Sequence, residues 1–190
     1  MGERQAAMFI QTETTPNPQT LKFLPGVDVM TQGTAFFTSA AEAKPSPLAE
    51  ALFAVEGVSA VFLGRDFITI TKEAEADWPV LKAPLLTAIM EHFVAGRPVM
   101  AGTAKPKVES GADDSEIVKQ IKELIDTRVR PAVAMDGGDI VFHGFENGIV
   151  KLEMHGSCSG CPSSTATLKN GIENMLKHYV PEVVAVEAVP

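Results

Sequence analysis

The chain has 190 residues, of which 45% are hydrophobic and 21% charged, as is usual for a globular protein. Its net charge of −8 is spread over both halves, which argues against binding of nucleic acid or of an anionic membrane surface, because cationic side chains carry much of such affinity. The chain contains no run of 18 apolar residues, so no membrane span is predicted. Its length is that of a globular protein of one or two domains.

The start of the chain, Met1 to Ala7, has no apolar signal segment and is too short and too acidic for an Arg-rich transit peptide. The only two cysteines, Cys158 and Cys161, share one short loop, whereas a secreted disulfide framework needs more cysteines at wider spacing. These features predict a protein of the reducing cytoplasm.

The first half alternates short strand-like runs with helical patterns. Strands are predicted at residues 8–14, 21–24, 59–63 and 67–72, and helices at residues 48–55 and between Asp77 and Gly96. Pro84 falls inside the second helix, where it removes a hydrogen bond from the first turns. This mixed order predicts an α+β domain over residues 8–101.

Residues 102–113 are polar, contain Gly and Pro, and show no apolar period, so they predict a flexible linker. The unit that follows, residues 114–190, begins with a helix that Ser115 caps and that Pro131 ends or kinks. Then come a tight turn at 136–139, a hairpin with strands 140–145 and 149–154, a helix at 165–179 and an edge strand at 183–189. We therefore expect an α+β protein with two small mixed α/β domains.

The segment His155-Gly-Ser-Cys-Ser-Gly-Cys-Pro carries the chemistry. Cys158 and Cys161 are three residues apart, so both sulfurs can face one metal, and Pro162 suits the first position of the next helix. The positive end of that helix is expected to lower the pKa of the thiols and to favour the metal-binding thiolate. A cluster or zinc site usually needs four ligands, so either two chains pair their loops or histidines complete the site in one chain.

Other interpretations of the two cysteines stay open at this point. They could be inert core residues, a thiol–disulfide oxidoreductase motif, or half of a zinc-stabilised interaction module. His155 precedes Cys158 by three residues, but strand alternation places it on the face opposite Met154, which predicts a solvated strand-end histidine. The Asp136–Asp139 segment is interpreted as a structural turn.

These residues resemble the Nfu-type proteins, which carry a NifU C-terminal domain. The matching segments are Met135-Asp-Gly-Gly-Asp, Gly156-Ser-Cys-Ser-Gly-Cys-Pro-Ser-Ser-Thr and Leu168-Lys-Asn-Gly-Ile-Glu. The run Met8-Phe-Ile-Gln-Thr-Glu-Thr-Thr-Pro-Asn-Pro-Gln-Thr-Leu-Lys-Phe and the hairpin around Arg65-Asp-Phe-Ile-Thr-Ile-Thr-Lys resemble the family's N-terminal domain.

The resemblance implies an iron–sulfur cluster scaffold and carrier without catalytic activity of its own. It implies a 4Fe–4S cluster that Cys158 and Cys161 of two protomers hold in a homodimer. The partners it implies are cluster donors of the assembly machinery and apo-proteins such as lipoyl synthase or aconitase-like enzymes. Mitochondrial members of the family carry a transit peptide, so we expect this chain to be a bacterial, cytoplasmic member.

Overall fold

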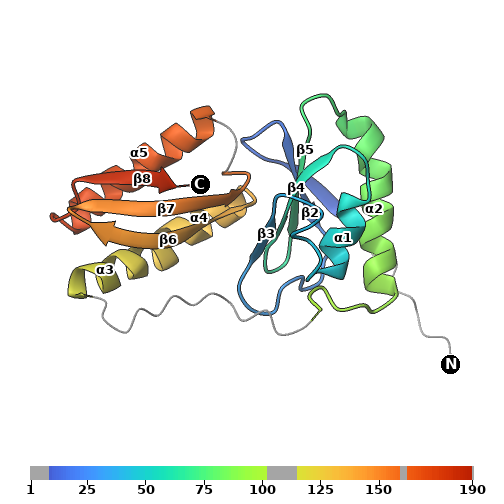
Figure 1. Ribbon diagram of the computed structural model, residues 1–190, viewed down its shortest axis with the longest axis horizontal. Coiled ribbons are helices and arrows are strands. Elements are labelled where there is room, and N and C mark those ends of the chain that lie inside the picture. Colours follow the sequence, from blue (N-terminus) through green and yellow to red (C-terminus); the bar gives the residue numbers. More distant parts are fainter. Residues whose placement is uncertain (1–8, 102–114, 159–161, 190) are drawn as a thin grey trace.

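The computed structural model describes residues 9–101, 115–158 and 162–189, which form two α+β domains side by side (Figure 1). The N-terminal domain comprises β1 (Gln11–Thr14), β2 (Thr20–Leu24), β3 (Ala35–Phe37), α1 (Pro47–Phe53), β4 (Val58–Leu63), β5 (Ile68–Lys72) and α2 (Trp78–Val94). The C-terminal domain comprises α3 (Glu116–Leu124), η1 (Ile125–Val129), α4 (Arg130–Met135), β6 (Gly138–Glu146), β7 (Ile149–Gly156), α5 (Pro162–Tyr179) and β8 (Ala185–Val189).

The N-terminal sheet is antiparallel, in the order β1-β2-β5-β4-β3, and α1 and α2 cover one of its faces (Figure 1). Alternation explains this layer: Ile68 and Ile70 are buried against the helices, while Thr69 between them points to the other face. Ser46 caps α1 by accepting a hydrogen bond from the Ala49 N–H at 3.1 Å. The predicted helices and strands of this half are thus confirmed, with α2 continuous through Pro84.

Strand β3 is the element of this half that the pattern did not predict. It has only three residues, pairs with β4 at the sheet edge, and places Phe36 opposite Phe62. A run this short gives no measurable alternation, so pairing with a neighbouring strand decides its conformation.

The C-terminal sheet has the order β6-β7-β8. The predicted hairpin is confirmed: Asn147 and Gly148 have φ values of 52° and 80°, as its tight turn requires. Strand β8 runs parallel to β7, and α5 connects the two. The helices pack on one face of this sheet. Ile121 of α3 and Leu176 of α5 are buried there in one core with Leu152 of β7.

The first helix of the C-terminal domain does not end at Pro131. It continues from α3 through a wider π-helical turn, η1, into α4, where Pro131 is the second residue. In a regular α-helix a residue every four positions drifts by about 40° per step around the axis. The wider turn offsets this drift and keeps Ile121, Ile125, Val129 and Val133 in one buried row.

Each domain has its own hydrophobic core, so the predicted α+β class with two domains is confirmed. The predicted linker, 102–113, lies outside the described residues, and the boundaries 8–101 and 114–190 stay a prediction. Within the described ranges, no helix is long and apolar enough to cross a membrane.

Candidate functional site

Cys158 lies in the turn between β7 and α5, just after the end of the central strand of the sheet. Its side chain is only 6% exposed and belongs to the core of the C-terminal domain. The Thr165 hydroxyl, on the first turn of α5, donates a hydrogen bond to the Cys158 carbonyl at 3.0 Å. Helix α5 begins at Pro162 as predicted, whereas Cys161 lies outside the described residues.

The turn that leads into β6 forms the other wall around Cys158. A Cβ atom placed on Gly138 would lie 2.5 Å from the Cys158 Sγ, so a glycine is required for this contact. Ser157 donates from its hydroxyl to the Asp136 carbonyl at 2.5 Å and from its N–H to the Gly137 carbonyl at 3.3 Å. Asp136 and Gly137 thus form a turn, as interpreted, whereas Gly138 and Asp139 already belong to β6. The segment is also part of the cysteine site, which the sequence interpretation missed.

Burial raises the pKa of the Cys158 thiol to about 11. A hydrogen bond from Ser157 works against this shift, and the nearby carboxylates of Asp136 and Asp139 add to it. The expectation that the helix start lowers the pKa is therefore wrong for Cys158, because desolvation by burial raises that pKa. The thiol is protonated at neutral pH, so metal binding there has to release a proton.

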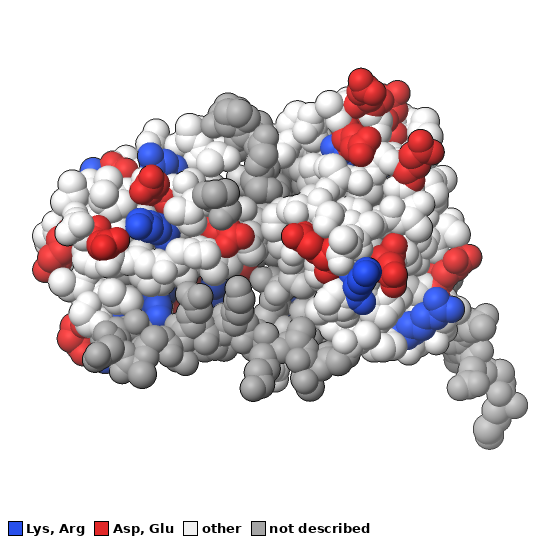
Figure 2. Space-filling view, in the orientation of Figure 1, with Lys and Arg blue, Asp and Glu red and all other residues white. Residues whose placement is uncertain are grey.

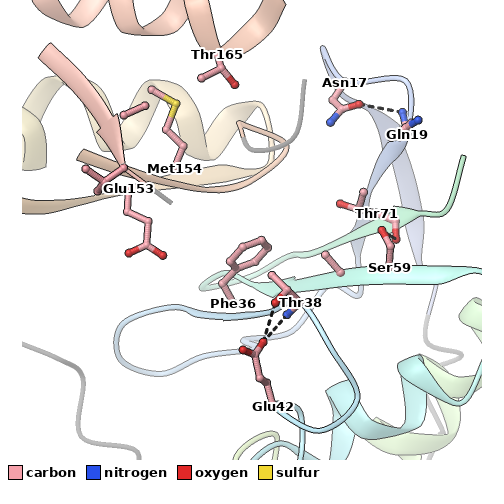
Figure 3. Close-up of a pocket in the computed structure, with 13 residues that line it drawn as sticks. Asn17, Gln19, Phe36, Thr38, Glu42, Ser59, Thr71, Glu153, Met154 and Thr165 are labelled. Atoms are coloured by element: carbon pink, nitrogen blue, oxygen red, sulfur yellow. Dashed lines mark hydrogen bonds between the residues drawn. The ribbon is translucent and has the colours of Figure 1, made fainter. Parts of the chain in front are cut away.

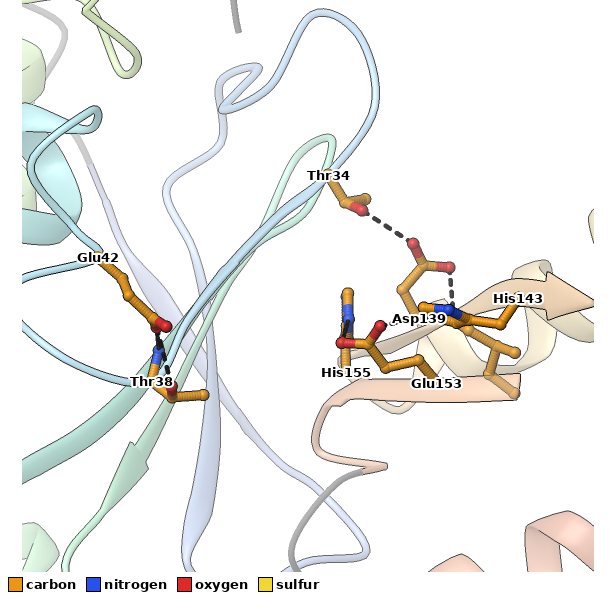
Figure 4. Close-up of polar contacts among 8 residues, drawn as sticks. Thr34, Thr38, Glu42, Asp139, His143, Glu153 and His155 are labelled. Carbon is orange, nitrogen blue, oxygen red and sulfur yellow. Dashed lines mark hydrogen bonds and ion pairs between the residues drawn. The ribbon is translucent and has the colours of Figure 1, made fainter. Parts of the chain in front are cut away.

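His155 lies on the face opposite Met154, as predicted, but it is not solvated. Its side chain is 15% exposed, because its ring stacks on Phe36 of the N-terminal domain with the ring centroids 4.8 Å apart. Its Nε2 bonds to the Glu153 carboxylate at 2.8 Å, and His143 bonds to the other oxygen of that carboxylate (Figure 4). Among the described residues, no three His, Cys, Asp or Glu side chains are placed to hold a metal ion together.

Glu153→Gln is expected to reduce stability more at pH 6 than at pH 3. Burial works to raise the pKa of the Glu153 carboxyl, but the hydrogen bonds from His155 and His143 outweigh it and hold the pKa below its ordinary value of 4.5. Such a group stabilises the fold fully above that ordinary value, and the contribution is lost as the pH falls through the lowered value. Urea unfolding at both pH values measures this difference.

Glu187→Gln, which removes an exposed carboxylate from the neighbouring strand β8, is the control for that measurement. It is expected to have the same small effect at pH 6 and at pH 3. An equal loss of stability at both pH values for Glu153→Gln would contradict the role assigned to this carboxylate.

A cavity of about 670 Å³ lies between the two domains (Figure 3). Its walls include Phe36, Thr38 and Ser59 from the N-terminal domain and Glu153, Met154 and Thr165 from the C-terminal domain. Because Thr165 also bonds to the Cys158 backbone, this space opens beside the segment that carries the cysteine. The N-terminal domain thus forms one wall of the approach to that segment.

Acidic and basic side chains both lie near the cysteine turn. Figure 2 shows Lys and Arg scattered among Asp and Glu over the face in view. The side chains nearest to the cysteine turn include Asp139, whose carboxylate accepts from the Thr34 hydroxyl at 2.9 Å and lies 3.5 Å from Arg130 Nε.

Comparison with known families gives a match in each domain. The family described as scaffold protein Nfu/NifU N terminal matches residues 10–96, and the family described as NifU-like domain matches residues 121–187. A solution NMR structure of a NifU-like protein from Saccharomyces cerevisiae covers 53% of this chain and 91% of its own, with a TM-score of 0.48 and 26% identity.

Curated relatives match the whole chain. A protein of Drosophila virilis named NFU1 iron–sulfur cluster scaffold homolog, mitochondrial, is 57% identical over 193 residues, which cover 100% of this chain. The homologue of the same name from Drosophila persimilis is 55% identical over 192 residues, and the match covers 67% of its length. The chain spans 64% of the length of the Drosophila virilis relative.

The expectation of a bacterial, cytoplasmic protein is contradicted by these relatives, which are named as mitochondrial proteins of flies. The cysteine count had led to the cytoplasm, and the first residues of the chain had led to a member without a transit peptide. A chain that spans only part of its relatives does not show what precedes those residues in a longer protein, so they were no basis for a location.

Proposed function

Since this chain belongs to the family of Nfu iron–sulfur cluster scaffold proteins, we propose that two copies of it hold one 4Fe–4S cluster and pass it to apo-proteins. The observation that carries the proposal is the cysteine count. The whole sequence has two cysteines, Cys158 and Cys161, and in the sequence both stand between the last residue of β7 and the first residue of α5. A cubane cluster needs about four thiolates, which two copies of this segment supply in a two-fold dimer.

The role proposed is that of a carrier rather than an enzyme. Cluster donors of the assembly machinery would load the dimer, and apo-proteins such as lipoyl synthase or aconitase-like enzymes would receive the cluster. A cluster whose ligands come from two chains is released when the two chains separate.

Anaerobic reconstitution with iron and sulfide tests the proposal. We expect a brown protein with four irons and four sulfides per dimer, in which mass analysis shows that the dimer forms together with the cluster. A colourless monomer that cycles between dithiol and disulfide would establish the oxidoreductase instead. A colourless protein that binds zinc and unfolds on chelation would establish a zinc-stabilised module.

A further inference from the structure

The N-terminal sheet has an outer face that α1 and α2 do not cover, yet side chains on it are buried. Phe62 and Thr69 are each 1% exposed, and Lys22 is 8% exposed. Their neighbours along β4 and β5, such as Val61 and Ile70, point into the helix-covered core instead. The C-terminal domain therefore covers this outer face, and the Phe62 ring lies against His155 and Gly156 of β7.

Three side chains from this half of the molecule bond to one short segment of the C-terminal domain. Lys22 Nζ donates to the Met135 carbonyl at 3.2 Å, and the Thr69 hydroxyl donates to the Gly137 carbonyl at 2.7 Å. The Thr34 hydroxyl donates to the Asp139 carboxylate at 2.9 Å (Figure 4). The three acceptors alternate along residues 135–139, so the N-terminal domain recognises the shape of this turn.

Glycine is required at the centre of this contact. Gly137 has a φ of 81°, which L side chains rarely adopt, and a Cβ there would lie 2.9 Å from the Thr69 Oγ1. The close approach of Thr69 therefore depends on Gly137. The glycine pair between the two aspartates serves both domains, since Gly138 makes room for the Cys158 sulfur on the other side.

The same turn connects the N-terminal domain to the cysteine segment. The Gly137 carbonyl accepts one hydrogen bond from Thr69 and a second from the Ser157 N–H, directly before Cys158. Gly138 packs against the Cys158 sulfur. Gly137 thus connects Thr69 of the N-terminal sheet directly to the backbone beside the cysteine.

We propose that the outer face of the N-terminal sheet, formed by Lys22, Phe36, Phe62 and Thr69, is a docking surface for the Met135–Asp139 turn of the same chain, and that this docking keeps Cys158 buried. The structure shows this turn bound to the surface. The hydrogen bonds from Lys22 and Thr69 and the stacking of Phe36 on His155 hold it there. If the proposed function holds, loading and release of a cluster require that the N-terminal domain lets go of this turn, because Gly138 of the turn packs on the sulfur that a second chain has to reach.

The test measures thiol alkylation of the full chain without metal, in a Cys161→Ser background so that only Cys158 reacts. The variant Lys22→Met with Thr69→Val removes two of the three hydrogen bonds and keeps side chains of similar volume. We expect alkylation of Cys158 to be roughly tenfold faster or more, since each lost hydrogen bond shifts such an equilibrium several-fold. Thr71→Val is the matched control: it lies on the same strand and face, but its hydroxyl pairs with Thr20.

Hydrogen exchange separates domain opening from unfolding. In the double variant, the amides of residues 135–139 and Ser157 are expected to exchange faster, while those of α2 keep the rate of the Thr71→Val control. Faster exchange with unchanged alkylation of Cys158 would overturn the proposal, as would no change in either measurement. Both readouts use protein without a cluster, so a failed reconstitution of the wild type would overturn the proposed function and leave this result standing.

Discussion

Cys158→Ser is expected to abolish cluster binding altogether. Each dimer would lose two of its four thiolates, one from each chain, and a serine hydroxyl is a poor replacement for a soft sulfur ligand. Anaerobic reconstitution followed by iron and sulfide analysis should find no stable cluster and no cluster-dependent dimer. The same loss is expected for Cys161→Ser.

Folding has to be checked alongside this loss, because Cys158 is buried and a buried hydroxyl without a partner costs about 1–3 kcal/mol. Circular dichroism and urea unfolding of the Cys158→Ser protein provide that check. Ser159→Ala, which changes the sequence between the two cysteines but keeps both thiols, should bind four irons per dimer like the wild type. If Cys158→Ser retained four irons per dimer, Cys158 would not be a ligand.

Gly138→Ala is expected to lower the free energy of unfolding of the C-terminal domain by about 1–3 kcal/mol and to expose Cys158. The added Cβ would lie 2.5 Å from the Cys158 Sγ and 2.9 Å from the His155 carbonyl oxygen. The carbonyl belongs to the paired backbone of β7 and yields little, so the sulfur is the atom that moves. Urea unfolding measures the stability, and alkylation of the apo-protein measures the exposure of the thiol.

Gly144→Ala provides the matched control on the same strand. A Cβ at Gly144 meets no atom within 4 Å, so the stability should stay within about 0.5 kcal/mol of wild type. Alkylation of Cys158 should keep its wild-type rate in this control. Equal behaviour of the two alanine variants would mean that Gly138 is not in contact with the cysteine in solution.

In the proposed docking, the N-terminal domain controls the exposure of Cys158. This role requires no metal-ligating residues in the N-terminal domain itself. Its outer face holds the turn beside Cys158, and its sheet forms one wall of the cavity next to Thr165. The surface buried by this contact includes Lys22, whose ammonium pairs with Glu13 at 3.5 Å and lies over the Phe67 ring. A lysine is rarely buried unless it is paired, so its position agrees with a specific interface rather than a chance contact.

Local sequence determined most of the secondary structure of this protein. Helix α2 begins after Asp77, the β4–β5 hairpin turns at residues 64–67, and the Asn147-Gly148 turn sets the β6–β7 hairpin, because caps, turns and alternation depend on neighbouring residues. The cysteine pair and its position before a helix that starts at Pro162 were also evident from neighbouring residues alone.

Tertiary structure decided what surrounds the cysteine. Counting outward from the hairpin turn pairs Asp139 with Gly156, but the irregularity between Phe142 and Gly144 shifts the register by one residue, so that Gly138 is the partner of Gly156. The sequence pattern does not reveal such a shift. Gly138 consequently contacts Cys158, and the thiol is buried instead of activated.

The contact between domains was likewise absent from the local pattern. His155 was predicted to be solvated because its strand face is polar, but Phe36, more than 100 residues earlier in the chain, covers it. Periodicity reports which face of an element is apolar, and it carries no information about a second domain that docks on the polar face. The sequence by itself therefore determined most of the elements and the position of the two cysteines, whereas packing between distant segments decided the exposure, the pKa and the partners of Cys158.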